Sequence, residues 1–223
     1  VSQSQYVDNA KHGVRVRGHS ENVRIGATTI ADNGARGLYV NNGKVITIAG
    51  NTISNNEDGV FVRDTVDTTV SGNTLAGNLE GVVLIVTNGS TVIDNEIAGG
   101  DVGIIVAAIH GTESDGHDNH ETDDTHDDHD TDTSTATTND TTTIEPTTTE
   151  TTSTDDSHDD HESGDSSSGH EHEDVVPGAT TITGNTVMDS TVGISLVGTT
   201  NDTVADNTVA NVGSWALTLE GGA

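Results

Sequence analysis

Histidine and carboxylate side chains in the middle of the chain have the spacing of metal ligands. Three His-x-x-His units are followed by a His-Glu-His triplet, and their histidines are His117, His120, His126, His129, His158, His161, His170 and His172. Neutral imidazole beside carboxylate suits Zn²⁺, Cu²⁺ or Ni²⁺. We expect several weak copper or zinc sites in this segment. The alternative is a solvated spacer whose histidines bind nothing.

Paired carboxylates form a second candidate site. Asp58 and Glu80 each stand directly before a glycine, and Arg63 and Asp64 follow Asp58 along the same repeat. Two such carboxylates on neighbouring coils can hold Ca²⁺ or divide the roles of general acid and general base. These four residues are the expected catalytic groups if the chain is an enzyme. Because the next repeat has Val102 at this position, we favour solvated turn residues and a non-catalytic chain.

A 22-residue repeat determines where these side chains lie. The same short phrase recurs around five asparagines, which are Asn51, Asn73, Asn95, Asn185 and Asn207. A period of this length is typical of a solenoid. The spacing from Asn95 to Asn185 is 90 residues, which exceeds one repeat by 68. One repeat therefore carries a long insertion, and we divide the chain into coils at 1–109, an insertion at 110–177 and further coils at 178–223.

Apolar residues form columns when the repeats are aligned. The columns are Ile48, Val70, Val92, Ile182 and Val204; Ile53, Leu75, Ile97, Val187 and Val209; Val60, Val82, Ile104 and Ile194; and Val62, Leu84, Val106 and Leu196. The alternation within each repeat and the β-branched residues favour strands. Twenty-two residues make about three short strands and three bends, which is one coil of a parallel β-helix. We predict an all-β fold of about seven such coils.

The asparagine column has a structural role in this prediction. Asparagine tolerates the left-handed backbone of a tight bend. Its side-chain amide can also donate to the asparagine one coil away, so that a hydrogen-bonded ladder runs along the axis. In the looser repeat before Asn51, Thr28 takes the asparagine's place. We expect the five asparagines to stabilise the stack and not to bind a ligand.

An outward row of apolar side chains is a candidate contact face. If Val60 and Val62 point inward, Phe61 points outward and stacks with Tyr39, Val83 and Ile105. An exposed apolar row of this kind often marks a binding surface. We predict Tyr39 and Phe61 as the ligand face, for sugar rings, a second protein or the base of the insertion. An ordinary sheet surface is the alternative.

Charge and composition narrow the class of protein. The formal net charge is −30, and the segment 110–177 holds 22 of the 37 acidic residues and nine of the 11 histidines. Such a polar segment is expected to be disordered. The excess of carboxylates indicates a halophilic source, because molar salt screens the repulsion among them. The lack of a cluster of basic residues excludes nucleic acid as a partner. The chain has no cysteine and no apolar run long enough to insert in a membrane.

The phrase GNTI-xx-N-xx-G-V-x-V resembles the right-handed parallel β-helix repeats of the pectate-lyase-like superfamily. It is most similar to the NosD-like, carbohydrate-binding-and-sugar-hydrolase repeats of haloarchaeal surface proteins, over roughly 23–109 and 178–217. The resemblance implies an extracellular or cell-surface protein whose partner is a polysaccharide or another surface protein. We expect a non-catalytic scaffold or carbohydrate-binding module. NosD-like copper or zinc handling and a polysaccharide lyase, hydrolase or epimerase are the alternatives.

Overall fold

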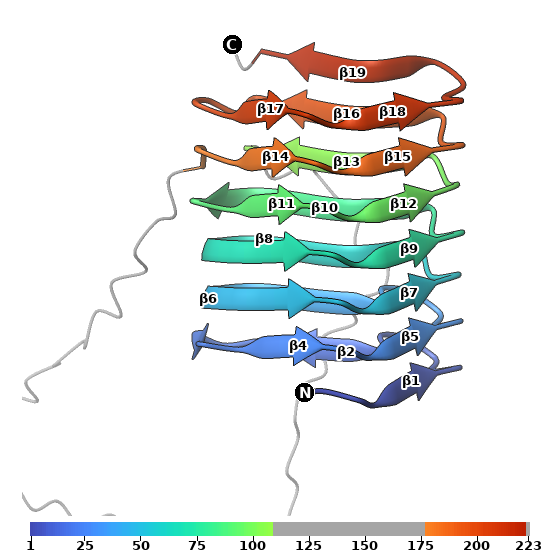
Figure 1. The fold of residues 1–223 in the computed structure, drawn as a ribbon. Helices are drawn as coiled ribbons and strands as arrows, with labels where there is room; N and C mark the ends of the chain where they lie inside the picture. The colour runs from blue at the N-terminus through green and yellow to red at the C-terminus, as the bar shows by residue number, and fades with distance from the viewer. Residues whose placement is uncertain (109–176, 222–223) are drawn as a thin grey trace, which may run out of the picture. The chain divides into compact units, whose positions relative to one another are not determined.

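The computed structural model describes residues 1–108 and 177–221, whose regular elements are all β-strands. Figure 1 shows them as coils stacked one on another, from β1 near the N-terminus to β19 near the C-terminus. A seven-stranded sheet contains β1 (Gln5–Val7), β5 (Thr29–Ala31), β7 (Thr52–Ser54), β9 (Thr74–Ala76), β12 (Glu96–Ala98), β15 (Thr186–Met188) and β18 (Thr208–Ala210). These seven strands mark seven coils, as the sequence predicts.

A twelve-stranded sheet supplies the rest of each coil. Its strands are β2 (Val14–Val16), β3 (Ser20–Glu21), β4 (Arg24–Gly26), β6 (Leu38–Ala49), β8 (Asp58–Ser71), β10 (Glu80–Asn88), β11 (Thr91–Ile93), β13 (Val102–Ala107), β14 (Thr181–Thr183), β16 (Val192–Val197), β17 (Thr203–Ala205) and β19 (Trp215–Glu220). Each strand pairs in parallel with the equivalent strand of the next coil, as in Ile53↔Leu75 and Leu75↔Ile97. The described chain is therefore a parallel β-helix.

The predicted division of each coil into three short strands is wrong for two coils. β6 and β8 run through a bend as continuous strands of 12 and 14 residues. Asp64 and Asp67 turn the backbone inside β8 with φ values of 52° and 56°. Between them, Thr65 and Val66 stay in register with Gly43 and Lys44 of the preceding coil. The ladder of backbone hydrogen bonds therefore continues through the bend, which sequence periodicity does not reveal.

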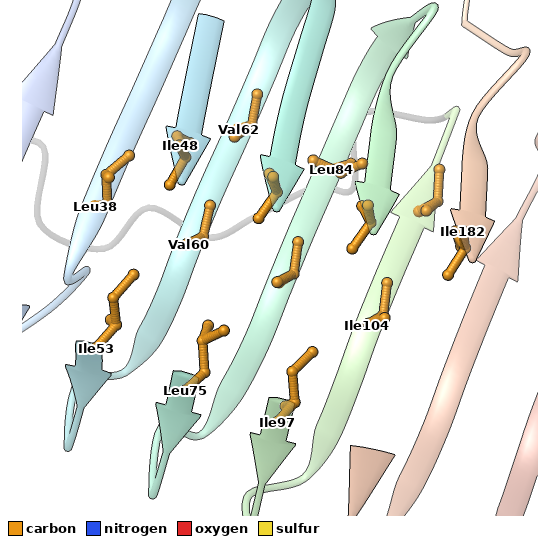
Figure 2. Close-up of a cluster of buried hydrophobic side chains, with 14 of the residues drawn as sticks. Leu38, Ile48, Ile53, Val60, Val62, Leu75, Leu84, Ile97, Ile104 and Ile182 are labelled. Carbon is orange, nitrogen blue, oxygen red and sulfur yellow. The ribbon is translucent and has the colours of Figure 1, made fainter. Parts of the chain in front are cut away.

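The predicted apolar columns form the core. All 18 residues of the four columns belong to one cluster or pack against it, and Figure 2 shows Ile48, Val60 and Leu75 among the side chains that fill the space between the strands. Only Val204 and Val209, in the last coils, are partly buried members. Full burial of a side chain of this size stabilises a fold by about 1.5–3 kcal/mol, so the stacked columns supply the main driving force for folding.

Glycines are required where coils come closest. A Cβ atom on Gly59 would lie 2.7 Å from the carbonyl oxygen of Gly81 and 2.8 Å from Leu75 Cδ2. Gly81 stands at the same position one coil later and is itself close to the backbone of Gly103. The glycines at the start of β8, β10, β13 and β16 thus let the backbones stack closely, which explains why they recur with the period of the coil.

The strands on either side of residues 109–176 stack as neighbours. β11 pairs with β14 in the register Val92↔Ile182, and β13 pairs with β16 in the register Ile104↔Ile194. The chain thus resumes one coil later, at the position that the 22-residue period predicts. The predictions of disorder and metal binding for the insertion concern residues outside the described part, except for Pro177. In the part that is described, no helix is long and apolar enough to cross a membrane.

Candidate functional site

The polar candidates lie on the outer surface of the sheet that contains β6, β8 and β10. Gly59 and Val60 both face the core, because a Cβ on Gly59 would touch Leu75 and Val60 is fully buried in the core cluster. Two inward residues in succession shift the alternation, so Asp58 and Phe61 both lie on the opposite side. We call this surface the outer face and define it by His12, Arg15, Arg36, Tyr39, Asp58, Phe61, Glu80 and Val83.

Asp58 and Glu80 are neighbours on adjacent coils, as the sequence predicts. Their Cα atoms are paired in the register of β8 and β10, and paired strands lie about 4.8 Å apart. Asp58 is engaged by a residue that the prediction missed: Arg36 Nε donates to Asp58 Oδ2 at 2.9 Å. The side chains of Arg36 and Asp58 are 20% and 9% exposed, so this is a largely covered ion pair.

Alignment of the repeats places Arg36 at the position equivalent to Asp58, so the sequence could have indicated it. Arg36 stands before Gly37 as Asp58 stands before Gly59, 22 residues later. One coil earlier, His12 stands before Gly13, and the backbone N–H of Arg36 donates to His12 Nδ1 at 3.4 Å. The position before the glycine therefore carries His12, Arg36, Asp58 and Glu80 in four successive coils. Following it toward the N-terminus would have found both basic residues.

Arg63 and Asp64 form a separate ion pair. Arg63 Nε lies 3.2 Å from Asp64 Oδ2, and both side chains are about 30% exposed, at 29% and 31%. Arg63 is five residues along β8 from Asp58, which is roughly 16 Å at about 3.3 Å per residue. The four predicted catalytic residues therefore do not converge on one point. They form a carboxylate pair, of which Asp58 is bound to Arg36, and a second, more exposed ion pair further along the strand.

The outward row of apolar residues is present, but its predicted exposure is wrong. Tyr39, Phe61, Val83 and Ile105 are in register on successive strands. They belong to a cluster separate from the core, in which Tyr39 is 8%, Phe61 2% and Val83 1% exposed, with Ile105 partly buried. The rings of Tyr39 and Phe61 meet edge to face, with centroids 5.7 Å apart. The row does not present bare ring faces to a ligand.

Cationic side chains explain part of this burial. The guanidinium carbon of Arg36 lies 3.9 Å from the centre of the Phe61 ring and 4.9 Å from that of Tyr39. Arg15 approaches the Tyr39 ring at 5.6 Å, and the His12 ring lies 5.2 Å from it. Each of the arginine–ring contacts contributes about 0.5–2 kcal/mol, more where water is excluded. Arg36 thus joins the aromatic pair to Asp58.

The five asparagines form the predicted ladder. Each donates from Nδ2 to Oδ1 of the next at 2.9 Å, through Asn51, Asn73, Asn95, Asn185 and Asn207. Each Oδ1 also accepts the backbone N–H of the preceding member of the ladder, as Asn95 Oδ1 does from Asn73 at 3.0 Å, and Asn73 Nδ2 donates to the Ile48 carbonyl at 3.0 Å. Thr28 begins the column, since its backbone N–H donates to Asn51 Oδ1 at 3.1 Å. The asparagines are structural residues of the bend.

Of the two predicted reasons for asparagine at these bends, the left-handed backbone is wrong. The left-handed residue is the one before each asparagine, and these residues are Gly50, Gly72, Asp94, Gly184 and Asp206. The ladder asparagines themselves do not have positive φ. Asn51, Asn73, Asn95 and Asn185 are at most 2% exposed, so their side chains point inward. Asparagine is needed here because one short side chain both donates and accepts, which satisfies buried backbone groups.

A second ladder was not predicted. Asn33 donates from Nδ2 to Asn56 Oδ1, and Asn56 donates to Asn78 Oδ1, both at 2.9 Å. Asn9 continues it toward the N-terminus with a bond of 2.7 Å to Asn33. The next coil has Gly100 at this position, so the ladder ends at Asn78. The spacing of 23 and 22 residues between its members was the available signal.

The eight histidines predicted as copper or zinc ligands lie outside the described residues. Among the residues that are described, no group of three or more histidine, aspartate or glutamate side chains is placed to hold a metal ion. Asp58 and Glu80 make only a pair there, and Arg36 occupies one oxygen of Asp58. The polar groups at this point of the outer face are thus the Arg36 guanidinium and these two carboxylates.

A family model described as "Right handed beta helix region" matches residues 1–117, just over half of the chain of 223. The match includes the coils that carry the outer face and the first three asparagines of the main ladder. No curated protein and no solved structure matches the chain.

Proposed function

The chain belongs to the right-handed β-helix family, and from that premise we propose that it is a non-catalytic, carbohydrate-binding scaffold of a halophile's cell surface. The observation that carries the proposal is the Arg36–Asp58 ion pair seated on Phe61, with Glu80 beside it on the next coil. This arrangement places charged donors and acceptors in a row along the axis of the solenoid, where an extended polymer can follow them.

The chemistry of the outer face suits hydroxyl groups. Arginine presents several N–H donors in a plane, and carboxylates accept from hydroxyls. Hydrogen bonds to charged groups are stronger than neutral ones, at about 1.5–3 kcal/mol. Arg36 is held in place by the rings beneath it and by Asp58, so little conformational entropy is lost when a ligand binds. A sugar is contacted through these groups, since the rings are covered.

Two features support a non-catalytic role. The Asp58 carboxylate is engaged by Arg36 at 2.9 Å, and Arg63 with Asp64 lies roughly 16 Å away along the strand. A general acid and a general base must both reach the bond that is broken. In addition, Val102 and Val192 continue the column of Asp58 and Glu80 in the next two described coils, so this column adds no further carboxylate to the pair there.

A binding screen tests the proposal. Neutral and acidic polysaccharides are embedded in native gels in molar salt, and retardation of the protein is measured. We expect retardation by at least one polysaccharide and about tenfold weaker binding in Arg36→Ala or Glu80→Gln, as expected for one charged hydrogen bond. Lys44→Ala is the matched control, because it removes one positive charge at an exposed position on β6 and is expected to bind like the unmodified protein.

The same polysaccharides are then assayed for new reducing ends and unsaturated products. Turnover that disappears in Asp58→Ala or Glu80→Ala would replace this proposal with a lyase, hydrolase or epimerase. Retention by none of the polysaccharides would refute carbohydrate binding and leave the scaffold role. Export, the halophilic source and a polysaccharide or surface-protein partner are parts of the same proposal and rest on the charge of −30 and on the repeat.

A further inference from the structure

An inner corner of the solenoid contains buried hydroxyl groups. It lies at the bend between the outer-face strands and the strands that carry Ile48, Val70 and Val92. Five side chains with hydroxyls are between 0% and 3% exposed there, and they are Thr65, Thr68, Thr87, Ser90 and Thr180. The column runs along the core, because Thr68 is paired with Ile46, a member of the core cluster.

The corner is filled differently in successive coils. In the coil that contains β6, Gly43 and Ile46 occupy it, and a Cβ on Gly43 would lie 3.0 Å from Ile46 Cδ1. Hydrocarbon fills the space in that coil. In the next coil Thr65 and Thr68 take these two positions, and Thr68 Oγ1 donates to Thr65 Oγ1 at 2.9 Å. Here a direct hydrogen bond satisfies both buried side chains.

The coil that contains β10 also has hydroxyls at these two positions, but they do not form a hydrogen bond with each other. Thr87 is paired with Thr65, and Ser90 directly precedes Thr91, which is paired with Thr69. Neither Thr87 Oγ1 nor Ser90 Oγ has a hydrogen-bond partner. Ser90 lacks the methyl group of Thr68, so this coil has more room in the corner. In the following coil Thr180 Oγ1 is also buried without a partner.

Three unpartnered oxygens are thus gathered within two adjacent coils. The Thr181 backbone N–H donates to the Ser90 carbonyl at 2.9 Å, which fixes Thr180 beside Ser90 at the spacing of paired strands, about 4.8 Å. A buried hydroxyl without a partner costs about 1–3 kcal/mol, and such groups are rare in folded proteins. A buried water molecule needs about two to four polar partners, and this corner supplies three.

We propose that the corner is a binding site for ordered water, which bridges Thr87, Ser90 and Thr180 inside the solenoid. The water replaces the direct bond that Thr68 and Thr65 make one coil earlier. It also joins the coil before residues 109–176 to the coil after them, because Ser90 and Thr180 lie on opposite sides of that segment in sequence. The bound water then stabilises the stack of coils at the point where residues 109–176 interrupt the repeat.

Threonine-to-valine replacement distinguishes a hydrated corner from a dry one, because valine keeps the shape and removes the hydroxyl. In a hydrated corner, Thr87→Val and Thr180→Val each remove a partner of the water and lower the unfolding midpoint by about 2–4 °C. Thr68→Val is the matched control, since it loses a known hydrogen bond and is expected to fall by a similar amount. A rise of the midpoint in Thr87→Val and Thr180→Val would overturn the proposal.

A second measurement uses the unmodified protein and does not depend on how the variants fold. High-resolution diffraction is expected to show a solvent peak within about 2.6–3.2 Å of at least two of the three hydroxyl oxygens. In solution, nuclear Overhauser effects to a long-lived water are expected at the methyl groups of Thr87 and Thr180. A map with no peak within reach of these oxygens would also overturn the proposal.

Discussion

The side-chain amide of Asn95 donates to Oδ1 of Asn185 at 2.9 Å, although 90 residues separate the two in sequence. The backbone N–H of Asn95 donates to the same oxygen at 3.0 Å. The ladder therefore passes from the coil before residues 109–176 to the coil after them without a change in geometry. Continuity of this ladder is what makes its inner members sensitive to mutation.

Replacement of Asn73 by alanine is expected to lower the free energy of unfolding by about 1–3 kcal/mol. The change leaves the backbone N–H of Asn51 and the Ile48 carbonyl without their side-chain partners. Asn207→Ala is the matched control at the last member of the ladder, which is only partly buried, and it is expected to cost less. Urea unfolding measures both. Equal losses at the two positions would contradict a ladder whose cost depends on burial.

Gly59→Ala is expected to destabilise the protein by about 3 kcal/mol, since overpacking a rigid site commonly costs 1–3 kcal/mol and the new Cβ meets backbone as well as side chain. It would lie 2.7 Å from the Gly81 carbonyl oxygen. Gly50→Ala meets nothing within 4 Å but has φ of +65°, so it is expected to cost about 1 kcal/mol from backbone strain alone. Thermal unfolding of both variants separates close approach from conformational freedom.

Arg36→Ala is expected to expose the rings of Tyr39 and Phe61 and to lower the free energy of unfolding by about 2 kcal/mol. The change removes the cation from both rings and leaves Asp58 Oδ2 without its Arg36 bond. Binding of a hydrophobic dye should rise in Arg36→Ala and much less in Arg36→Met, whose chain still covers the rings. Unchanged dye binding in Arg36→Ala would mean that Arg36 is not what buries them.

The fold followed from the sequence because a strict period leaves little freedom. Apolar residues recur at the positions of Ile48, Ile53 and Val60 in the aligned repeats. Stacking in register is the arrangement that buries all these columns at once. The main asparagine ladder was found for the same reason. The position of the left-handed residue in each bend was not predicted correctly. It precedes the asparagine by one position, and repeat spacing alone does not separate neighbouring residues of a bend.

The outer face was harder to predict because it does not repeat. The position before the strand glycine is His12, Arg36, Asp58 and Glu80 in turn, so no consensus marks it. The outward direction of the Tyr39 and Phe61 side chains was predicted correctly, since both lie outside the core. Exposure was inferred badly, because a long arginine side chain can cover rings on two neighbouring strands. Burial of this kind depends on side-chain direction, which alternation in a sequence does not record.

Copper and zinc binding is predicted to depend on the histidine-rich segment. Calorimetric titration of Cu²⁺ or Zn²⁺ into the full chain is expected to show several weak sites. A version lacking 112–176 should take up much less metal, although it retains His12, His19 and His110. Neutral imidazole is the binding form, so uptake by the full chain should fall as pH drops below the ordinary histidine pKa of about 6.5. Equal uptake by the two proteins would exclude the segment as the site.

Deletion of 112–176 is also expected to leave thermal unfolding in molar salt nearly unchanged. The coils on either side stack through Val92↔Ile182 and Ile104↔Ile194, and those contacts remain when the segment is removed. Closure entropy grows only with the logarithm of loop length, so the two connections differ by a few kcal/mol at most. The deletion also removes much of the chain's negative charge, whose self-repulsion molar salt screens within about 3 Å.

Measuring the unfolding of the full chain and of the deleted protein at different ionic strengths therefore separates the effect of charge repulsion from the effect of loop length. In dilute buffer the full chain should unfold at a lower temperature than the deleted one, because repulsion among its carboxylates is then unscreened. Raising the salt should bring the two midpoints together. A deleted protein that is much less stable than the full chain in molar salt would show that 112–176 contributes packing to the solenoid, and the coils could then no longer be treated as a self-sufficient stack.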